Sequence, residues 1–108
     1  MRALLKGPAD KGFREIIVAN ELHPLQELVG GYIETVTVKL SPQVIVICNE
    51  EARLQHLAYN CTIEGKDYTG EFDCPFFGSI LLVGADGEEF TDCPISLVQA
   101  NGMILEEA

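Results

Sequence analysis

Cysteine and histidine are the residues of this sequence that could take the most chemical roles, because they can ligate metal ions and act as nucleophiles. The four cysteines are separated by 13, 13 and 19 positions, and they are Cys48, Cys61, Cys74 and Cys93. Zinc sites usually take two ligands from one turn, as in Cys-x-x-Cys, and no such pair occurs in the chain. We therefore expect reduced, structural thiols, with no metal and no other cofactor.

His56 and Cys61 form the one near-neighbour pair that resembles a nucleophile and its base. Five positions do not place two side chains together on a regular helix. The Gly-x-Ser-x-Gly elbow of serine hydrolases is also absent. A cysteine-dependent hydrolase using this pair is the weakest of three functional hypotheses, and we expect no catalytic residues.

Carboxylates are numerous enough to suggest general acid–base chemistry. Glu88 and Glu89 are adjacent in a predicted strand, so their side chains point to opposite faces and cannot act as a pair. Glu71 and Asp73 share a face, but a general acid needs a pKa raised by burial, and this segment is polar. These carboxylates are expected to be solvated charges.

The charge is strongly negative and uneven along the chain. The chain has 17 Asp and Glu residues and 7 Lys and Arg residues, which gives a formal net charge of −10. Residues 1–54 are close to neutral, whereas residues 55–108 hold ten acidic residues and only Lys66 as a base. This balance excludes direct binding of nucleic acid or anionic membrane through a basic surface. It fits either a well-solvated surface or an acidic face that docks on a basic partner.

The first half of the chain is the easier to assign to elements. Short apolar runs at 2–6 and 13–19 flank a turn-rich connector and predict an antiparallel pair of strands. Apolar spacing over 20–29, followed by Gly30-Gly31, predicts a short helix. Residues 32–40 alternate as in a strand, and 44–48 are apolar on both faces, which predicts a central strand.

The second half is less regular. Residues 52–59 suggest one or two helical turns, and 60–76 read as a loop with at most an edge strand. Asp86-Gly87 predicts a hairpin between 78–83 and 88–91 in which Val83 faces Phe90. A last helix is expected from Pro94 to about Ala100, capped by Asp92 or Thr91.

Together these elements predict an α+β fold. We expect a single small domain over 1–108 with a five- to six-stranded, largely antiparallel sheet and two short helices. The apolar run near the N-terminus is too short for a signal peptide, and no segment is long enough to cross a membrane. The expected location is therefore the cytoplasm, with an unknown oligomeric state.

Three segments resemble one known family. They are Leu25-Gln26-Glu27-Leu28-Val29-Gly30-Gly31-Tyr32-Ile33-Glu34, then Cys48-Asn49-Glu50-Glu51-Ala52-Arg53-Leu54 through Asn60, and 78–92. This is similar to the domain-of-unknown-function family numbered 3846, small proteins of Gram-positive bacteria, phages and mobile elements. The segment 61–74 departs from the family pattern. The resemblance implies a phage or mobile-element setting and supplies no catalytic residues.

The leading hypothesis is a non-enzymatic protein-interaction module that docks a basic partner protein through its acidic second half. The candidate acidic face comprises Glu71, Asp73, Asp86, Glu88 and Glu89. The alternative is a small-ligand-binding domain, nucleotide-like or other, with a pocket near Tyr32, Asn49 and Asn60. Polar groups that packing does not require mark the candidate ligand- or partner-binding residues, which are Tyr32, Glu34, Asn49, Glu50 and Asn60.

Overall fold

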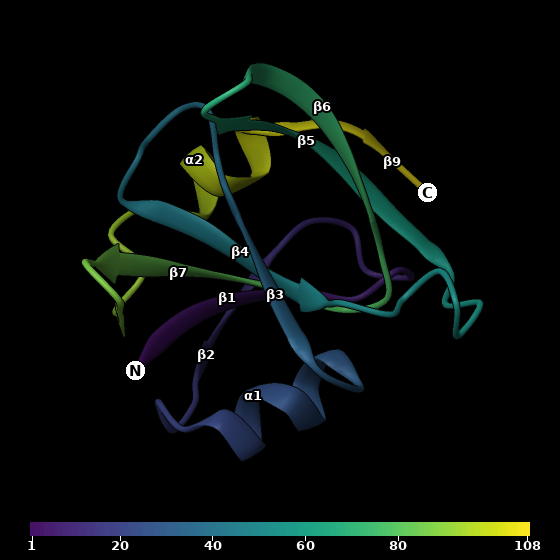
Figure 1. The fold of residues 1–108 in the computed structure, drawn as a ribbon, viewed down its shortest axis with the longest axis horizontal. Coiled ribbons are helices and arrows are strands. Elements are labelled where there is room, and N and C mark those ends of the chain that lie inside the picture. The colour runs from purple at the N-terminus through teal and green to yellow at the C-terminus, as the bar shows by residue number, and fades with distance from the viewer.

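The computed structural model describes residues 1–108 and arranges them in three layers (Figure 1). A six-stranded sheet lies in the middle, and helix α1 (Leu22–Val29) covers one of its faces. A three-stranded sheet and helix α2 (Leu97–Gly102) cover the other face. The predicted α+β class with two short helices is confirmed. Neither helix is long and apolar enough to cross a membrane.

The larger sheet has the strand order β2-β1-β7-β4-β3, with β8 paired to β7, and every pair is antiparallel. Its strands are β1 (Arg2–Lys6), β2 (Arg14–Ile17), β3 (Ile33–Thr37), β4 (Val44–Asn49), β7 (Ile80–Asp86) and β8 (Glu89–Thr91). All six residues of β4 are buried, because neighbouring strands pair with both edges and layers cover both faces. The prediction of a central strand is confirmed.

A second sheet takes the order β6-β5-β9, formed by β5 (Tyr59–Asp67), β6 (Gly70–Phe77) and β9 (Ile104–Glu107). The prediction that 60–76 is a loop with at most an edge strand is therefore wrong, since this segment forms an edge strand and also most of the central strand β5, the two longest strands of the fold. The buried face of β5 carries Cys61, Ile63 and Gly65, a set with little apolar bulk. The alternation of apolar and polar residues that would identify this strand in the sequence is consequently weak.

The two faces of the larger sheet carry separate cores. The core between the sheets includes Cys48, Cys61 and Cys93, with the half-buried Cys74 packed against it. The core beneath α1 is aliphatic and includes Leu25, Val29 and residues of β1, β4 and β7. All four thiols are free, and they are buried or half-buried, as expected for cysteines that pack in the core.

The β7–β8 hairpin is confirmed, but its register differs from the prediction. The two turn residues are Gly87 and Glu88, so Ala85 pairs with Phe90, and the predicted pairing of Val83 with Phe90 is wrong. Gly87 has a φ of 62°, which suits glycine at the first position of a two-residue hairpin turn.

Helix α2 begins later than predicted. Its N-cap is Ser96, which shares a capping box with Gln99: each side chain bonds to the other's backbone N–H, at 2.9 and 3.1 Å. The predicted start at Pro94 is wrong. Asp92 does not cap the helix, because its carboxylate accepts the backbone N–H of Arg2 at 2.7 Å.

Residues 50–56 form consecutive turns in place of the predicted one or two helical turns. One hydrogen bond of the α-helical, i to i−4 type forms there, from the N–H of Gln55 to the carbonyl of Glu51 at 2.9 Å. His56 has a φ of 56° and reverses the chain before β5. These turns connect the end of β4 with the second sheet and form one side of the candidate site.

Candidate functional site

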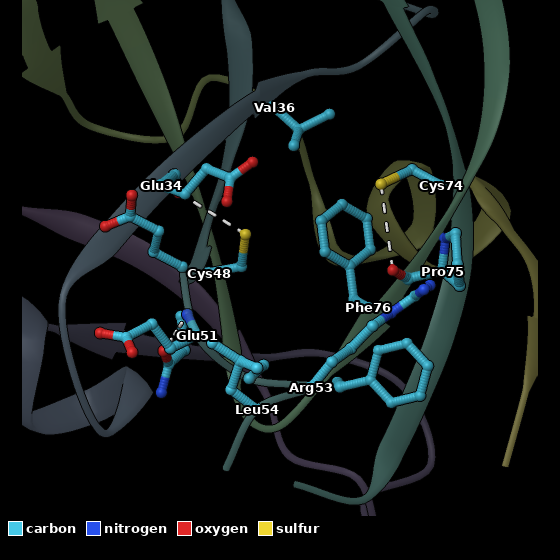
Figure 2. Close-up of a pocket in the computed structure, with 13 residues that line it drawn as sticks. Glu34, Val36, Cys48, Glu51, Arg53, Leu54, Cys74, Pro75 and Phe76 are labelled. Atoms are coloured by element: carbon cyan, nitrogen blue, oxygen red, sulfur yellow. Dashed lines mark hydrogen bonds between the residues drawn. The ribbon is translucent and has the colours of Figure 1, made fainter. Parts of the chain in front are cut away.

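A pocket of about 260 Å³ opens between the two sheets, where edge strand β3 faces edge strand β6. Glu34 and Val36 come from β3, Cys48 and Asn49 from the end of β4, and 50–54 from the turns. Residues 74–77 of β6 form the opposite wall. Figure 2 shows Cys48 and Cys74 on opposite sides of the pocket.

Asn49 holds the β4 side of this pocket in place. Its amide nitrogen donates to the carbonyl of Val29 at 3.2 Å and to Oε1 of Gln55 at 3.0 Å. Its amide oxygen accepts the backbone N–H of Glu51 at 2.8 Å, an Asx-turn that starts the 50–56 segment. Both donors and the acceptor are thereby used, which makes Asn49 a structural residue of the pocket.

The two glycines that end α1 have different roles. Gly30 adopts φ 83° as the left-handed residue that ends the helix. At Gly31 a Cβ atom would lie 3.0 Å from the Asn49 amide nitrogen and 3.2 Å from its oxygen. The Leu-Val-Gly-Gly-Tyr-Ile-Glu segment and the Cys-Asn-Glu-Glu segment therefore meet at Asn49.

The two thiols of the pocket are poor nucleophiles at neutral pH. Burial, with smaller contributions from Glu34 and Cys74, raises the pKa of the Cys48 thiol to about 12. Burial likewise raises the pKa of Cys74. A thiol reacts as the thiolate, so the site favours packing over covalent chemistry.

An aromatic and cationic stack lies at the β6 wall of the pocket. The Arg53 guanidinium lies 4.8 Å from the centre of the Phe77 ring, and Tyr59 packs edge-on against the same ring at 5.7 Å. No carboxylate lies within ion-pair distance of Arg53. This wall is not predictable from the sequence, because the polar, turn-rich composition of residues 60–76 indicates a loop.

The sequence-predicted site residues separate in the fold. Glu34, Asn49 and Glu50 line the pocket, whereas Tyr32 is 65% exposed beside it in a shallow hollow with Gln26 and Glu51. Asn60 lies elsewhere and is fully buried. The pocket predicted near Tyr32, Asn49 and Asn60 is thus not assembled from those three side chains.

Asn60 is a structural partner of a buried lysine. Its amide oxygen accepts from the Lys6 ammonium at 2.8 Å, and its amide nitrogen donates to the carbonyls of Lys6 and Gly78, each at 2.8 Å. The carboxylate of Glu107 lies 3.3 Å from the same ammonium. This network leaves Asn60 with no free group for a ligand.

The predicted acidic face is divided between the two sheets. Glu71 and Asp73 are exposed on β6, while Asp86, Glu88 and Glu89 form the tip of the β7–β8 hairpin. In Figure 1, β6 begins at the top and β7 ends at the left. The hairpin tip contains no basic residue.

Folding also brings cations of the first half onto acids of the second half. The Lys39 ammonium lies 3.1 Å from Glu64 and 3.1 Å from Glu71. The hydrogen bonds to these two carboxylates raise the pKa of Lys39. The outer face of the small sheet is therefore less negative than its sequence suggests, and the hairpin tip stays uncompensated.

His56 and Cys61 are not brought together. Cys61 is fully buried in the core between the sheets, and burial raises the pKa of its thiol to about 11. His56 is exposed, and no hydrogen bond joins the two side chains. The geometry offers no nucleophile–base pair at these positions.

The fold and pocket define a class of small α+β domain in which a three-stranded sheet and a helix close one face of a larger antiparallel sheet. The chain belongs to the family described as Domain of unknown function (DUF3846), whose family model matches residues 1–104. The match includes both segments that meet at Asn49, and the resemblance is confirmed. No curated protein and no solved structure matches the chain.

Proposed function

We propose that this protein is a non-enzymatic interaction module that binds a basic partner protein through carboxylates at its surface. One observation carries the proposal: Lys and Arg side chains lie within ion-pair distance of only four of the 17 acidic side chains, and His23 contacts a fifth, Glu27. The other twelve have no cationic partner within 4.0 Å. Such unpaired charge steers association with a positively charged surface and weakens as salt screens it.

Two groups of these free carboxylates stand out. One is the hairpin tip with Asp86, Glu88 and Glu89, and the other is the pocket rim with Glu34, Glu50 and Glu51. The setting implied by the resemblance, a phage or mobile element in a Gram-positive bacterium, makes a host protein in the cytoplasm the natural partner.

Small-ligand binding in the pocket between the sheets has less support. Clefts for drug-sized ligands usually enclose about 300–1,000 Å³, and the pocket between the sheets encloses about 260 Å³. Asn49 and Asn60, the polar groups expected to contact such a ligand, have their amides engaged within the protein.

A two-step binding experiment tests the proposal. Tagged protein captures partners from a lysate of the encoding organism at about 50 mM and about 500 mM NaCl, a range over which screening becomes severe. Each captured protein is identified, purified and titrated against the module. We expect a basic partner with 1:1 binding whose affinity falls at least about tenfold between the two salt concentrations.

Two triple variants with equal charge change serve as matched controls: D86N/E88Q/E89Q at the hairpin tip and E34Q/E50Q/E51Q at the pocket rim. At least one must weaken binding at low salt. The proposal is overturned if the purified partner is acidic, or if its affinity responds neither to salt nor to either variant.

A further inference from the structure

Building on the proposed function, we infer that the pocket between β3 and β6 receives an arginine side chain of the basic partner. The inference rests on three features of the pocket: apolar walls, a free carboxylate at one end and a volume suited to one side chain.

The walls are apolar where a side-chain stem would lie. Val36 and Leu54 line the pocket from β3 and the turns, and Cys74 and Phe76 line it from β6. The side chains of arginine and lysine bury their methylene stems on such surfaces while the charged head reaches a polar group. Because the cavity of about 260 Å³ is smaller than common ligand clefts, it suits one inserted side chain.

The charges around the pocket select a cation. The Glu34 carboxylate lies beside Cys48 at one end of the pocket (Figure 2) and has no basic partner. Glu50 and Glu51 add negative charge nearby, although Glu51 points away from the β6 wall in Figure 2. The one cation of the pocket, Arg53, extends toward Pro75 and stacks on Phe77, so it leaves Glu34 free.

Arginine fits this environment better than lysine does. Its guanidinium is more weakly hydrated than an ammonium, so entering a partly apolar cavity costs it less. Its fork of N–H donors also matches a carboxylate in two-point geometry. Glu34 lines the pocket without a basic partner, and its carboxylate provides such an acceptor.

The test uses three nine-residue peptides that share two flanking lysines and differ only at the central residue, which is arginine, lysine or citrulline. Citrulline keeps the shape of arginine and removes its charge. Fluorescence anisotropy gives the dissociation constant of each. We expect the arginine peptide to bind about tenfold more tightly than the citrulline peptide, as for one charge-assisted hydrogen bond, with lysine intermediate.

Three variants of the protein test whether the tighter binding of the arginine peptide arises at the pocket. In Glu34→Gln the advantage of arginine over citrulline should shrink to less than about twofold. Glu88→Gln removes one free carboxylate from the hairpin tip instead and should leave the ratio unchanged. Val36→Phe fills the pocket without altering charge and should also abolish the advantage.

The outcomes separate this inference from the proposed function. Equal binding of the arginine and citrulline peptides to the native protein overturns the pocket assignment, and so does an unchanged ratio in Glu34→Gln. The proposed function still stands in both cases if all three peptides bind with strong salt dependence. If none of the three lysine-flanked peptides binds with an affinity that falls as salt rises, the proposed function fails as well.

Discussion

The Lys6 ammonium and the Asn60 side-chain oxygen lie 2.8 Å apart, and neither residue has any exposed surface. A buried charge is tolerated only when its hydrogen-bonding groups are satisfied. Here Asn60 accepts from the ammonium and also donates to the Lys6 carbonyl, so it ties β1 of the larger sheet to β5 of the smaller one.

Removing the Asn60 amide should therefore destabilise the folded protein strongly. Asn60→Ala leaves the Lys6 ammonium short of an acceptor in a closed site, and we expect the free energy of unfolding to fall by about 3 kcal/mol. Urea denaturation measures the change. Lys66→Met, which removes an exposed lysine, should alter stability by less than about 0.5 kcal/mol. Similar effects in both variants would show that the buried network is unimportant.

Glu107 should contribute more to stability than its neighbour. Its carboxylate is 3.3 Å from the Lys6 ammonium, whereas Glu106 has no cationic partner. Since Glu107 is partly exposed, Glu107→Gln should cost about 1 kcal/mol. Glu106→Gln removes the same charge one position earlier on β9 and should be close to neutral. Thermal unfolding of the two variants side by side gives the comparison, and equal melting temperatures would contradict it.

Gly31 is predicted to be intolerant of any side chain. In Gly31→Ala the new Cβ crowds the Asn49 amide at 3.0–3.3 Å. That amide is held by three hydrogen bonds and cannot move freely, so we expect a loss of about 1–2 kcal/mol. At Gly102, in the last turn of α2, a Cβ meets no atom within 4 Å. Gly102→Ala should accordingly stabilise the protein by about 0.5 kcal/mol, as measured by chemical denaturation.

Stability should fall at alkaline pH. Burial raises the pKa of Cys48 to about 12 and that of Cys61 to about 11, against 9.0 for an ordinary thiol. At a pH between the ordinary thiol pKa of 9.0 and these raised values, the unfolded chain binds fewer protons than the folded protein. The free energy of unfolding therefore decreases as pH rises through this range. The decrease is at most about 1.4 kcal/mol per pH unit for each thiol.

Urea titrations at about pH 8, 9.5 and 10.5, a range that begins below the ordinary thiol pKa and ends above it, measure this slope. The contribution of the two thiols to the free energy of unfolding is fully present below about pH 9. It is lost as the pH approaches the thiol pKa values of the folded protein. Cys48→Ala should make the decline shallower. A decline of the same steepness in that variant would assign it to other groups.

Several elements were predictable because their signals are local. Residues of α1 repeat at helical spacing and end at Gly30, whose left-handed conformation stops the helix. The strand β4 is apolar at nearly every position, which is the pattern of a strand covered on both faces. Two apolar runs around a turn were sufficient to predict the β1–β2 pair.

The second sheet was not predictable in the same way. Along β6 the inward residues include Cys74 and Phe76, but Pro75 and acidic side chains interrupt them on the outward face. Pro75 is compatible with a strand here because β6 is a sheet edge, where one side needs no hydrogen bonds. Edge position is a property of the assembled sheet, so no local pattern reveals it.

The site was predictable only in part. Polar groups that packing does not require marked Glu34 and Glu50 as candidate binding residues, and both line the pocket between the sheets. The same criterion selected Asn60, which is buried because Lys6 requires its amide. Which polar groups face solvent and which satisfy one another depends on pairs far apart in the chain.

The sequence by itself determined the net charge of −10, the α+β class and the helix that ends at Gly30-Gly31, because composition and short-range periodicity encode them. Only the tertiary structure decided where that charge remains free. Lys39 and Lys6 fold onto acids of the second half, and the hairpin tip and Glu34 keep carboxylates without partners. Ion pairs act over a few ångströms in space, whatever the separation of their residues along the chain.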